Sequence, residues 1–190
     1  TGADFAGHFV AAYGYDGASR LQTVSDGVNS AAYTYLAYSP LVSQIDFAAN
    51  STPVMSTLKQ YDFLNRLTNI SMVNSAQEML DSHAYVYNSA NQRTAVTNAD
   101  NSYWLYQYDA LGQVISGRKH WSDDTPVAGQ QFQYGFDDIG NRKTTAFGGD
   151  EDGVNLELAS YNANSLNQYI QRAVPGYVSS LGTANSNATV

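Results

Sequence analysis

A short motif recurs along this chain of 190 residues. Each copy has two aromatic residues separated by one residue, then Asp or Asn, two further residues, and Gly, Asn or Ser. The second aromatic position falls at 15, 35, 61, 87, 108, 136 and 161, so neighbouring copies are 20 to 28 residues apart. Because a period in this range is typical of a small supersecondary unit that is stacked many times, the sequence predicts a repeat protein.

Five copies are well preserved and two are degenerate. The preserved copies occupy residues 13–21, 61–67, 85–93, 106–114 and 134–142. One degenerate copy begins at Tyr33 and runs into Pro40, which favours an edge strand or a bulge. The other has Tyr161, with Asn162 at the turn position. We therefore predict about seven repeats over residues 10–172, a leading segment at 1–9, and a Ser/Asn/Gly-rich tail or the start of a next module at 173–190.

The residue types of one copy predict its local structure. Side chains alternate along a strand, so the two aromatic residues lie on the same face of a strand. The Asp or Asn that follows can accept a hydrogen bond from the backbone two residues later, and Gly or Asn three residues on suits a left-handed position. Each repeat is then a strand, a turn and a returning strand. This predicts an all-β fold of tandem antiparallel β-hairpins.

The conserved side chains of the motif have expected structural roles. Pairs such as Tyr85 with Tyr87 would form an aromatic ladder along one face of the sheet. The Arg after a turn could stack on a neighbouring Tyr or pair with the turn Asp. The turn aspartates recur too regularly for an active site, which needs one of each group. We expect all of them to be structural: Asp16, Asp62, Asp109 and Asp137.

Three segments lie outside the motif. Residues 75–80 fit a turn and a half of helix, with Ser75 and Glu78 as a capping box, and fit equally well a strand edge leading into His83. Loops are predicted at 122–129 and at 147–153.

The composition excludes several classes of protein. Nine Lys and Arg against 17 Asp and Glu give a net charge of −8, which argues against nucleic acid or an anionic membrane as a partner. The absence of Cys excludes a disulfide framework, a thiolate zinc site and a Cys nucleophile. No apolar run approaches the roughly 18 residues of a membrane span. Low charge with 15 Tyr is typical of a β-rich extracellular protein, and the lack of an initiator Met leads us to expect a piece of a longer chain.

The preserved copies, Tyr-x-Tyr-Asp-x-x-Gly followed by Arg or Gln and then Leu or Val, resemble the YD repeats of RHS-repeat proteins over about residues 10–170. The resemblance implies repeats wound into a curved or spiralling β-sheet. In polymorphic toxins and insecticidal toxin complexes, this sheet closes into a shell around a C-terminal toxin. It implies a structural scaffold segment of a large secreted protein, extracellular or on the cell surface, whose partner is the rest of its own polypeptide. The Asp-Pro-x-Gly element of the family's self-cleaving segment is absent, so autoproteolysis is not expected.

No nucleophile is placed beside a base, and neither Gly-x-Ser-x-Gly nor His-Glu-x-x-His occurs, so we expect no catalysis. The weak catalytic candidates are His120, Asp123 and Asp124, which follow one another around Trp121. Two carboxylates a few ångströms apart could serve a glycosidase-like hydrolase, which is one alternative function. The other interpretation of these residues is a polar hairpin loop.

A second acidic segment is a weak candidate for metal binding. Asp150, Asp152 and Glu157 supply the oxygen ligands that Ca²⁺ prefers, but they lack the full spacing of a calcium loop. We therefore expect no cofactor, with Ca²⁺ as the single alternative.

Aromatic side chains suggest a further alternative, a carbohydrate-binding module. Flat rings stack on sugar rings, and the candidates for polysaccharide binding are Trp104, Tyr106, Tyr108 and Trp121. The competing interpretation is that these rings pack in a core or against a neighbouring sheet. The open edges of a hairpin array also predict self-association by strand pairing.

Overall fold

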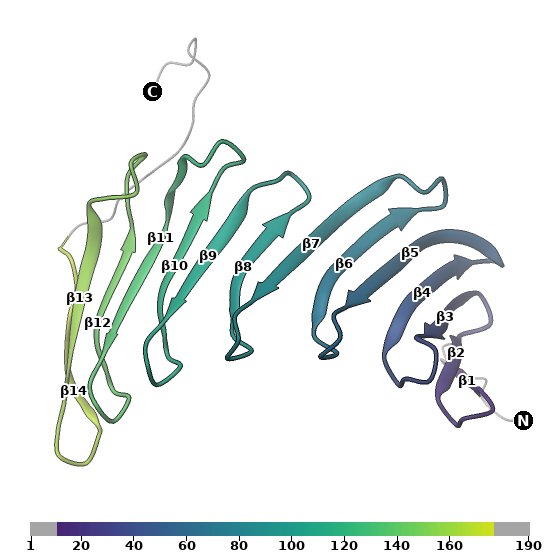
Figure 1. Cartoon of the computed structure of the whole chain (residues 1–190), viewed down its shortest axis with the longest axis horizontal. Helices are drawn as coiled ribbons and strands as arrows, with labels where there is room; N and C mark the ends of the chain where they lie inside the picture. Colours follow the sequence, from purple (N-terminus) through teal and green to yellow (C-terminus); the bar gives the residue numbers. More distant parts are fainter. Residues whose placement is uncertain (1–10, 177–190) are drawn as a thin grey trace, which may run out of the picture. The chain divides into compact units, whose positions relative to one another are not determined.

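The structure is a computed structural model, and it describes residues 11–176. Within these residues every regular element is a β-strand, and short loops join successive strands at alternate ends (Figure 1). None of them lies in a helix with the length and apolarity needed to span a bilayer. The chain divides into two compact units, one ending at Ala84 and one beginning at Tyr85. The predicted all-β fold of tandem antiparallel hairpins is confirmed.

The first unit contains strands that pair antiparallel in chain order. They are β1 (Ala12–Tyr15), β2 (Leu21–Ser25), β3 (Asn29–Tyr35), β4 (Val42–Ala49), β5 (Thr52–Tyr61), β6 (Leu67–Asn74) and most of β7 (Met79–Tyr87).

The second unit has the same organisation, with antiparallel pairing in chain order. Its strands are β8 (Arg93–Asn98), β9 (Tyr103–Tyr108), β10 (Val114–His120), β11 (Pro126–Phe136), β12 (Arg142–Gly148), β13 (Leu156–Ala163) and β14 (Tyr169–Ala173).

The register separates two kinds of face in each unit, because directly paired residues project to the same side of a sheet. In the first unit one face carries large apolar and aromatic side chains, as in the paired rows Tyr13–Val24–Ala31–Phe47 and Tyr33–Ile45. The opposite face carries small or polar side chains, as in the row Thr23–Ala32–Asp46–Ser56–Val73. We call these the aromatic face and the small-residue face.

The second unit alternates in the same way. Its aromatic face includes the rows Val96–Trp104–Lys119 and Tyr106–Gly117–Phe132–Phe147. Its small-residue face includes the row Gln107–Ser116–Gln133–Ala146–Leu158. The predicted alternation of side chains along each strand therefore extends across the whole width of each unit.

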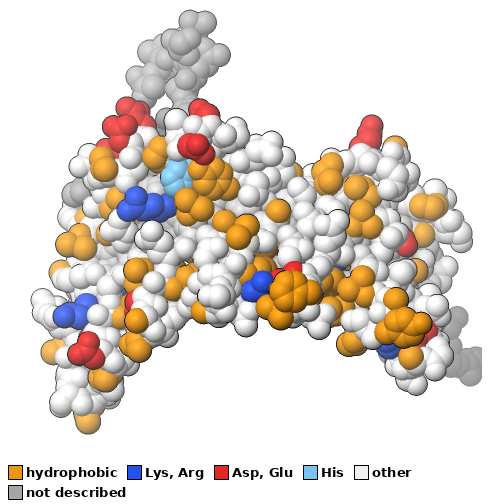
Figure 2. All heavy atoms as spheres, viewed as in Figure 1, with side chains coloured by type: hydrophobic (Ala, Val, Ile, Leu, Met, Phe, Trp, Pro, Cys, Tyr) orange, Lys and Arg blue, Asp and Glu red, His pale blue; other side chains and the backbone are white. Residues whose placement is uncertain are grey.

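Few side chains are buried among the described residues. The buried hydrophobic ones are Val73, Val96 and Ala159, whereas large apolar side chains such as Leu158 and Ile170 are more than half exposed. Figure 2 shows hydrophobic side chains dispersed over the visible surface with few charged ones between them. Backbone ladders and contacts between neighbouring strands, rather than a thick core, therefore hold each unit together.

The structure corrects several expectations about local structure. The degenerate copy that runs into Pro40 is not an edge strand, since β3 pairs with both β2 and β4, but its pairing with β4 does shift register between Thr34 and Tyr35, as in a bulge. Pro40 itself lies in the β3–β4 loop, which the Leu36 N–H closes by donating to the Leu41 carbonyl at 2.9 Å. The final turn begins at Asn164 rather than Asn162, because β13 continues to Ala163. β11 already begins at Pro126, so the loop predicted at 122–129 is shorter.

Residues 75–80 form a hairpin loop and the start of β7, so the strand alternative holds and the helical one is wrong. Part of the domain prediction cannot be compared with the structure. The leading segment 1–9 and residues 177–190 of the tail lie outside the described residues.

Candidate functional site: the seam between successive hairpins

Within residues 11–176, ten hairpin loops close with one hydrogen-bond pattern. The N–H of the first loop residue donates to the carbonyl of the fifth, and the N–H of the fourth donates to the carbonyl of the first, at 2.8–3.1 Å. The fourth residue is left-handed in every case, with φ from 59° to 89°. This confirms the predicted left-handed position. The first residues are Asp16, Asp62, Asn74, Asn88, Asn98, Asp109, Trp121, Asp137, Asp150 and Asn164.

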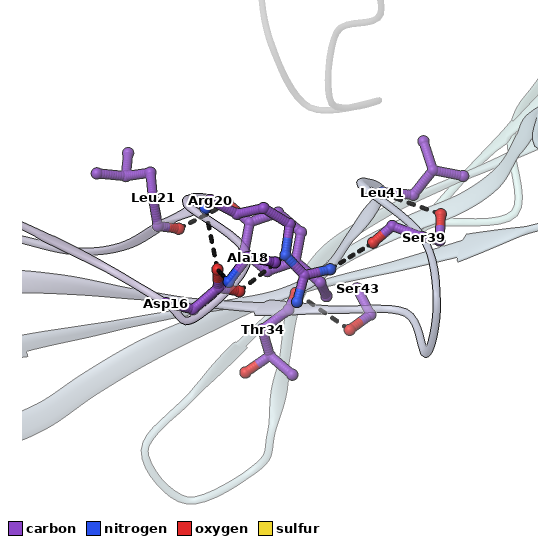
Figure 3. Close-up of polar contacts among 9 residues, drawn as sticks. Asp16, Ala18, Arg20, Leu21, Thr34, Ser39, Leu41 and Ser43 are labelled. Carbon is purple, nitrogen blue, oxygen red and sulfur yellow. Dashed lines mark hydrogen bonds and ion pairs between the residues drawn. The ribbon is translucent and has the colours of Figure 1, made fainter.

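The side chain of an Asp or Asn first residue accepts hydrogen bonds from within its own loop, as Figure 3 shows for Asp16. Its Oδ1 accepts from the backbone N–H groups of Ala18 and Arg20, both at 2.9 Å, and its Oδ2 accepts from Arg20 Nε at 2.8 Å. The Arg20 backbone N–H, opposed by burial, holds the pKa of Asp16 below its ordinary value of 3.8. Asp16 is therefore a structural acceptor whose charged form is favoured by the loop.

The first and fifth residues of a loop are chemically matched. In four of the five loops whose first residue is Asp, the fifth donates from its side chain: Arg20 and Arg66 at 2.8 and 2.7 Å, Gln113 and Asn141 at 2.9 Å. In the loop that begins at Asp150 the sixth residue, Asn155, donates instead, at 2.6 Å. Where the first residue is Asn, its Nδ2 donates to an acceptor on the fifth: Glu78, Gln92, Ser102 and Gln168, at 2.7–3.1 Å. Eight of these ten loops thus pair a donor with an acceptor on their first and fifth residues, the loops at Trp121 and Asp150 being the exceptions.

Tyrosine hydroxyls join one hairpin to the preceding one. Tyr35, Tyr61 and Tyr108 each end the first strand of a hairpin, and each donates to the carbonyl of the residue that begins the second strand of the hairpin before it. The acceptors are Leu21 at 2.6 Å, Val42 at 2.9 Å and Arg93 at 2.7 Å respectively. Burial raises the pKa of Tyr61, consistent with a hydroxyl partly shielded from water.

An arginine side chain adds to the same junction. The Arg20 guanidinium lies 4.3 Å from the centre of the Tyr35 ring, and its Nη1 donates to the Ser39 carbonyl at 2.6 Å (Figure 3). Arg93 stacks on a Tyr of its own hairpin instead, 4.0 Å from the Tyr85 ring centre, and so does not join two hairpins in this way. Both predicted roles of the Arg, stacking on Tyr and pairing with the turn Asp, are confirmed at Arg20. We call these Tyr and Arg contacts between consecutive hairpins the seam.

The aromatic candidates for sugar binding occupy different places. Trp104 and Tyr106 lie side by side on the aromatic face with ring centres 6.2 Å apart and planes at 3°, and Phe132 stacks on Trp104 at 6.0 Å. This stack is made of other residues than the predicted ladder, which is based on motif pairs such as Tyr85 with Tyr87. Tyr108 uses its hydroxyl in the seam. Trp121, 47% exposed, is the first residue of the β10–β11 loop, two residues after Lys119, which pairs with Trp104.

Two of the catalytic candidates at the end of β10 and in the β10–β11 loop, His120 and Asp124, contact the same residue, Tyr103, whereas Asp123 does not. The His120 ring stacks on Tyr103 at 5.1 Å, and the Tyr103 hydroxyl donates to Asp124 Oδ1 at 2.7 Å. Asp123 accepts from the hydroxyl and the backbone N–H of Thr125, and these bonds lower the pKa of Asp123. A glycosidase acid needs a raised pKa, so the environment of Asp123 favours a turn acceptor over a proton donor.

The calcium candidates form part of the β12–β13 loop. Asp150 is the first residue of that loop and accepts from the N–H groups of Asp152 and Val154 and from Asn155 Nδ2, the last at 2.6 Å. Glu157 lies on β13 and is buried. Within residues 11–176, no three His, Asp or Glu side chains are grouped so that they could hold a metal ion. The geometry thus assigns Asp150 to loop closure.

Sequence reasoning missed two of the hairpin loops. The loops that begin at Asn74 and Asn98 lie at the opposite ends of the strands from the tyrosine-bearing loops, and no aromatic pair precedes them. Their signal was available in the spacing, because Asn is followed four residues later by Glu78 and Ser102, both acceptors. The tyrosine acceptors could not be found in this way, since they are backbone carbonyls.

The fold and its matched loops define a protein of tandem β-hairpin repeats. Its similarity to a known repeat family and to solved structures identifies the type of repeat. The RHS Repeat family model matches residues 87–125, about a fifth of the chain. The chain therefore carries an RHS repeat, and the resemblance inferred from the YD motifs is confirmed. No curated protein matches the chain.

Solved structures share the fold at low sequence identity. The crystal structure of TcdB2-TccC3-Cdc42 is similar with a TM-score of 0.61 and 16% identity, covering 78% of this chain and 7% of that one. TcdB2-TccC3 without its hypervariable C-terminal region gives 0.52 and 13%, covering 84% and 10%. TcdB2-TccC3-TEV gives 0.51 and 12%, covering 86% and 11%. The chain thus spans about a tenth or less of the length of these structures.

Proposed function

We propose that the chain is a structural scaffold segment of a large secreted, toxin-related RHS/YD-repeat protein, extracellular in location and without catalysis of its own. The observation that carries this proposal is the seam. The same tyrosine-to-carbonyl contact joins consecutive hairpins at Tyr35, Tyr61 and Tyr108, so the recurring side chains serve to attach one repeat to the next. The RHS repeat and the shared fold support it.

A deletion of one whole repeat tests the scaffold proposal. Removing residues 109–136 joins Tyr108 to Asp137, so the new hairpin again has an aromatic residue followed by a turn Asp, and every later strand keeps its direction. We expect a β-rich, cooperatively unfolding protein, because contacts in a repeat array are made only between neighbours. Circular dichroism and urea unfolding measure the outcome.

The matched control removes one strand instead of two. Deleting residues 109–120 joins Tyr108 to the intact loop that begins at Trp121, but it reverses the direction of every later strand and moves the later seam contacts to the wrong end. We expect this variant to lose ordered structure beyond the junction. If the whole-repeat deletion unfolds while the one-strand deletion does not, the repeat is not the unit of assembly and the proposal fails.

The rest of the same polypeptide is the proposed partner, and an isolated chain should pair through its open edge. Among the described residues β14 pairs only with β13, and all of its residues from Tyr169 to Ala173 are exposed. Unpaired strand edges associate readily. We expect concentration-dependent dimers in sedimentation velocity, reduced by Ile170→Lys, a charge on the edge. A monomer at all concentrations contradicts the expectation.

A second candidate function, binding of polysaccharide, has one observation in its favour. Trp104 forms a stacked array with Tyr106 and Phe132 on the aromatic face. A glycan array would detect binding, and Trp104→Ala should abolish it whereas Tyr38→Ala, fully exposed in the β3–β4 loop, should not. Equal loss in both variants would point to misfolding or to a different site.

A further inference from the structure

The small-residue face of the second unit carries a shallow depression of about 380 Å³. Strands β9 to β13 line it, and its lining has nearly equal polar and apolar character. The row Gln107–Ser116–Gln133 crosses its floor, and Arg118 stands two residues beyond Ser116 on the same side of β10. Thr144 contributes a hydroxyl from β12.

Arg118 differs from the other arginines of the chain. Arg20 and Arg66 form ion pairs with turn aspartates at 2.8 and 2.7 Å. The guanidinium groups of Arg93, Arg142 and Arg172 lie over tyrosine rings. Among residues 11–176 the Arg118 side chain has no carboxylate within 4.0 Å, no hydrogen bond and no ring beneath it. A guanidinium with five unused donors is thus available to a ligand.

The neighbours of Arg118 also keep unused hydrogen-bonding groups. Within the described part of the chain the side-chain amides of Gln107 and Gln133 and the hydroxyl of Thr144 have no hydrogen-bond partner. The paired residues beside Arg118, Leu105 and Gln131, contribute no opposite charge. The depression therefore combines one uncompensated positive charge with a row of neutral donors and acceptors.

We propose that this depression binds the carboxylate side chain of an acidic peptide segment. Arg118 takes the carboxylate through its planar fork, which matches carboxylate geometry in a bidentate pair. The amides of Gln107 and Gln133 pair with the peptide groups on either side, because each offers a donor and an acceptor, as a peptide group does. An acidic sugar fits less well, since the stacked rings of this unit, Trp104 and Phe132, project to the opposite face.

The test uses the whole 190-residue chain and a defined probe. Acetyl-Gly-Glu-Gly-amide is titrated into isotope-labelled protein while the NMR signals of the Arg118 Nε–H and of the Gln107 and Gln133 side-chain amides are followed. We expect saturable shifts at these groups that weaken at about 0.5 M salt, because an exposed ion pair is screened. Acetyl-Gly-Gln-Gly-amide should produce roughly tenfold weaker binding or none.

Two variants with the same change in charge separate the site from the general field. Arg118→Gln should weaken binding at least about tenfold, and Lys143→Gln, an exposed cation on β12, should leave it unchanged. Circular dichroism checks that both fold. Equal affinity in the two variants, equal binding of the two peptides, or no saturable shift overturns the proposal. Tighter binding of a trigalacturonate than of the Glu peptide overturns the peptide as ligand.

Discussion

Removing the Tyr61 hydroxyl is the most direct test of the seam. Tyr61→Phe keeps the ring and deletes only the bond to the Val42 carbonyl, which is 2.9 Å long and partly buried. Loss of a neutral hydrogen bond of this kind costs about 1 kcal/mol. For a chain of this size, such a loss lowers the midpoint of thermal unfolding by roughly 2–4 °C. The control is Tyr38→Phe, because the Tyr38 side chain is fully exposed in its loop.

The converse substitution should stabilise the protein. Phe136 ends β11 as Tyr108 ends β9, and Val114 begins β10 as Arg93 begins β8. A hydroxyl added by Phe136→Tyr should therefore reach the Val114 carbonyl, as Tyr108 reaches Arg93. We expect a gain below about 1 kcal/mol, since Val114 is 38% exposed and water competes for its carbonyl.

Urea unfolding and amide hydrogen exchange together measure these effects. A repeat array can open in parts, so the exchange rates around Val42 report the local loss in Tyr61→Phe directly. The reasoning is refuted if Tyr61→Phe behaves like Tyr38→Phe in both measurements. It is also refuted if Phe136→Tyr destabilises the chain by as much as Tyr61→Phe does.

Three further outcomes follow from the loops and the strand pairs. Asp62→Asn should destabilise its loop, because Arg66 can only donate, and Arg66→Glu alone should destabilise it through two facing carboxylates. The double variant recreates an Asn–Glu pair, and a double-mutant cycle in urea should show the recovery. Gly135→Ala should destabilise the β11–β12 hairpin, because the new Cβ would lie 2.5 Å from Thr144 Oγ1, and Thr144→Ala should relieve the effect in thermal unfolding. Because the loop's backbone hydrogen bond lowers the folded-state pKa of Asp16 below 3.8, its contribution is present above the unfolded-state pKa and is lost as the pH falls through the folded-state value. Urea midpoints should therefore be flat near neutral pH and fall below about pH 4, and a smaller fall in Asp16→Asn would identify this carboxyl as one source.

The sequence predicts the local parts of this fold well because each is closed within a few residues. The loop at Asp16 needs only the Asp, a left-handed Ser19 and Arg20, all within five positions. The periodic Tyr and Asp therefore suffice to place the hairpins and to assign the turn aspartates. The loop at Trp121 shows the limit, because its first residue is not Asp or Asn and its aspartates, Asp123 and Asp124, stand at other positions of the loop.

The seam is harder to predict because it depends on register between hairpins. Tyr35 donates to an acceptor 14 residues earlier in the chain and Tyr61 to one 19 residues earlier, although each acceptor has the same position relative to its tyrosine, at the start of the preceding hairpin's second strand. The strands between donor and acceptor differ in length, with 5 and 7 residues in β2 and β3 but 8 and 10 in β4 and β5, so the separation along the chain changes while the contact does not. The sequence does not reveal that Arg118 lacks a partner either. That property depends on the strand register, which places the uncharged Leu105 and Gln131 beside it on the neighbouring strands.

The donor–acceptor pair that most loops contain affects how such an array can gain repeats by duplication and how its repeats can change afterwards. A duplicated hairpin carries both residues of its own pair, so an inserted copy can close its loop without any further substitution. A change from the Asp type of pair to the Asn type is harder, because a single substitution at Asp62 or Arg66 places two donors or two acceptors opposite each other. Conversion requires two substitutions in concert, so the pair type of a hairpin should persist as a lineage marker of the ancestral copy from which it arose.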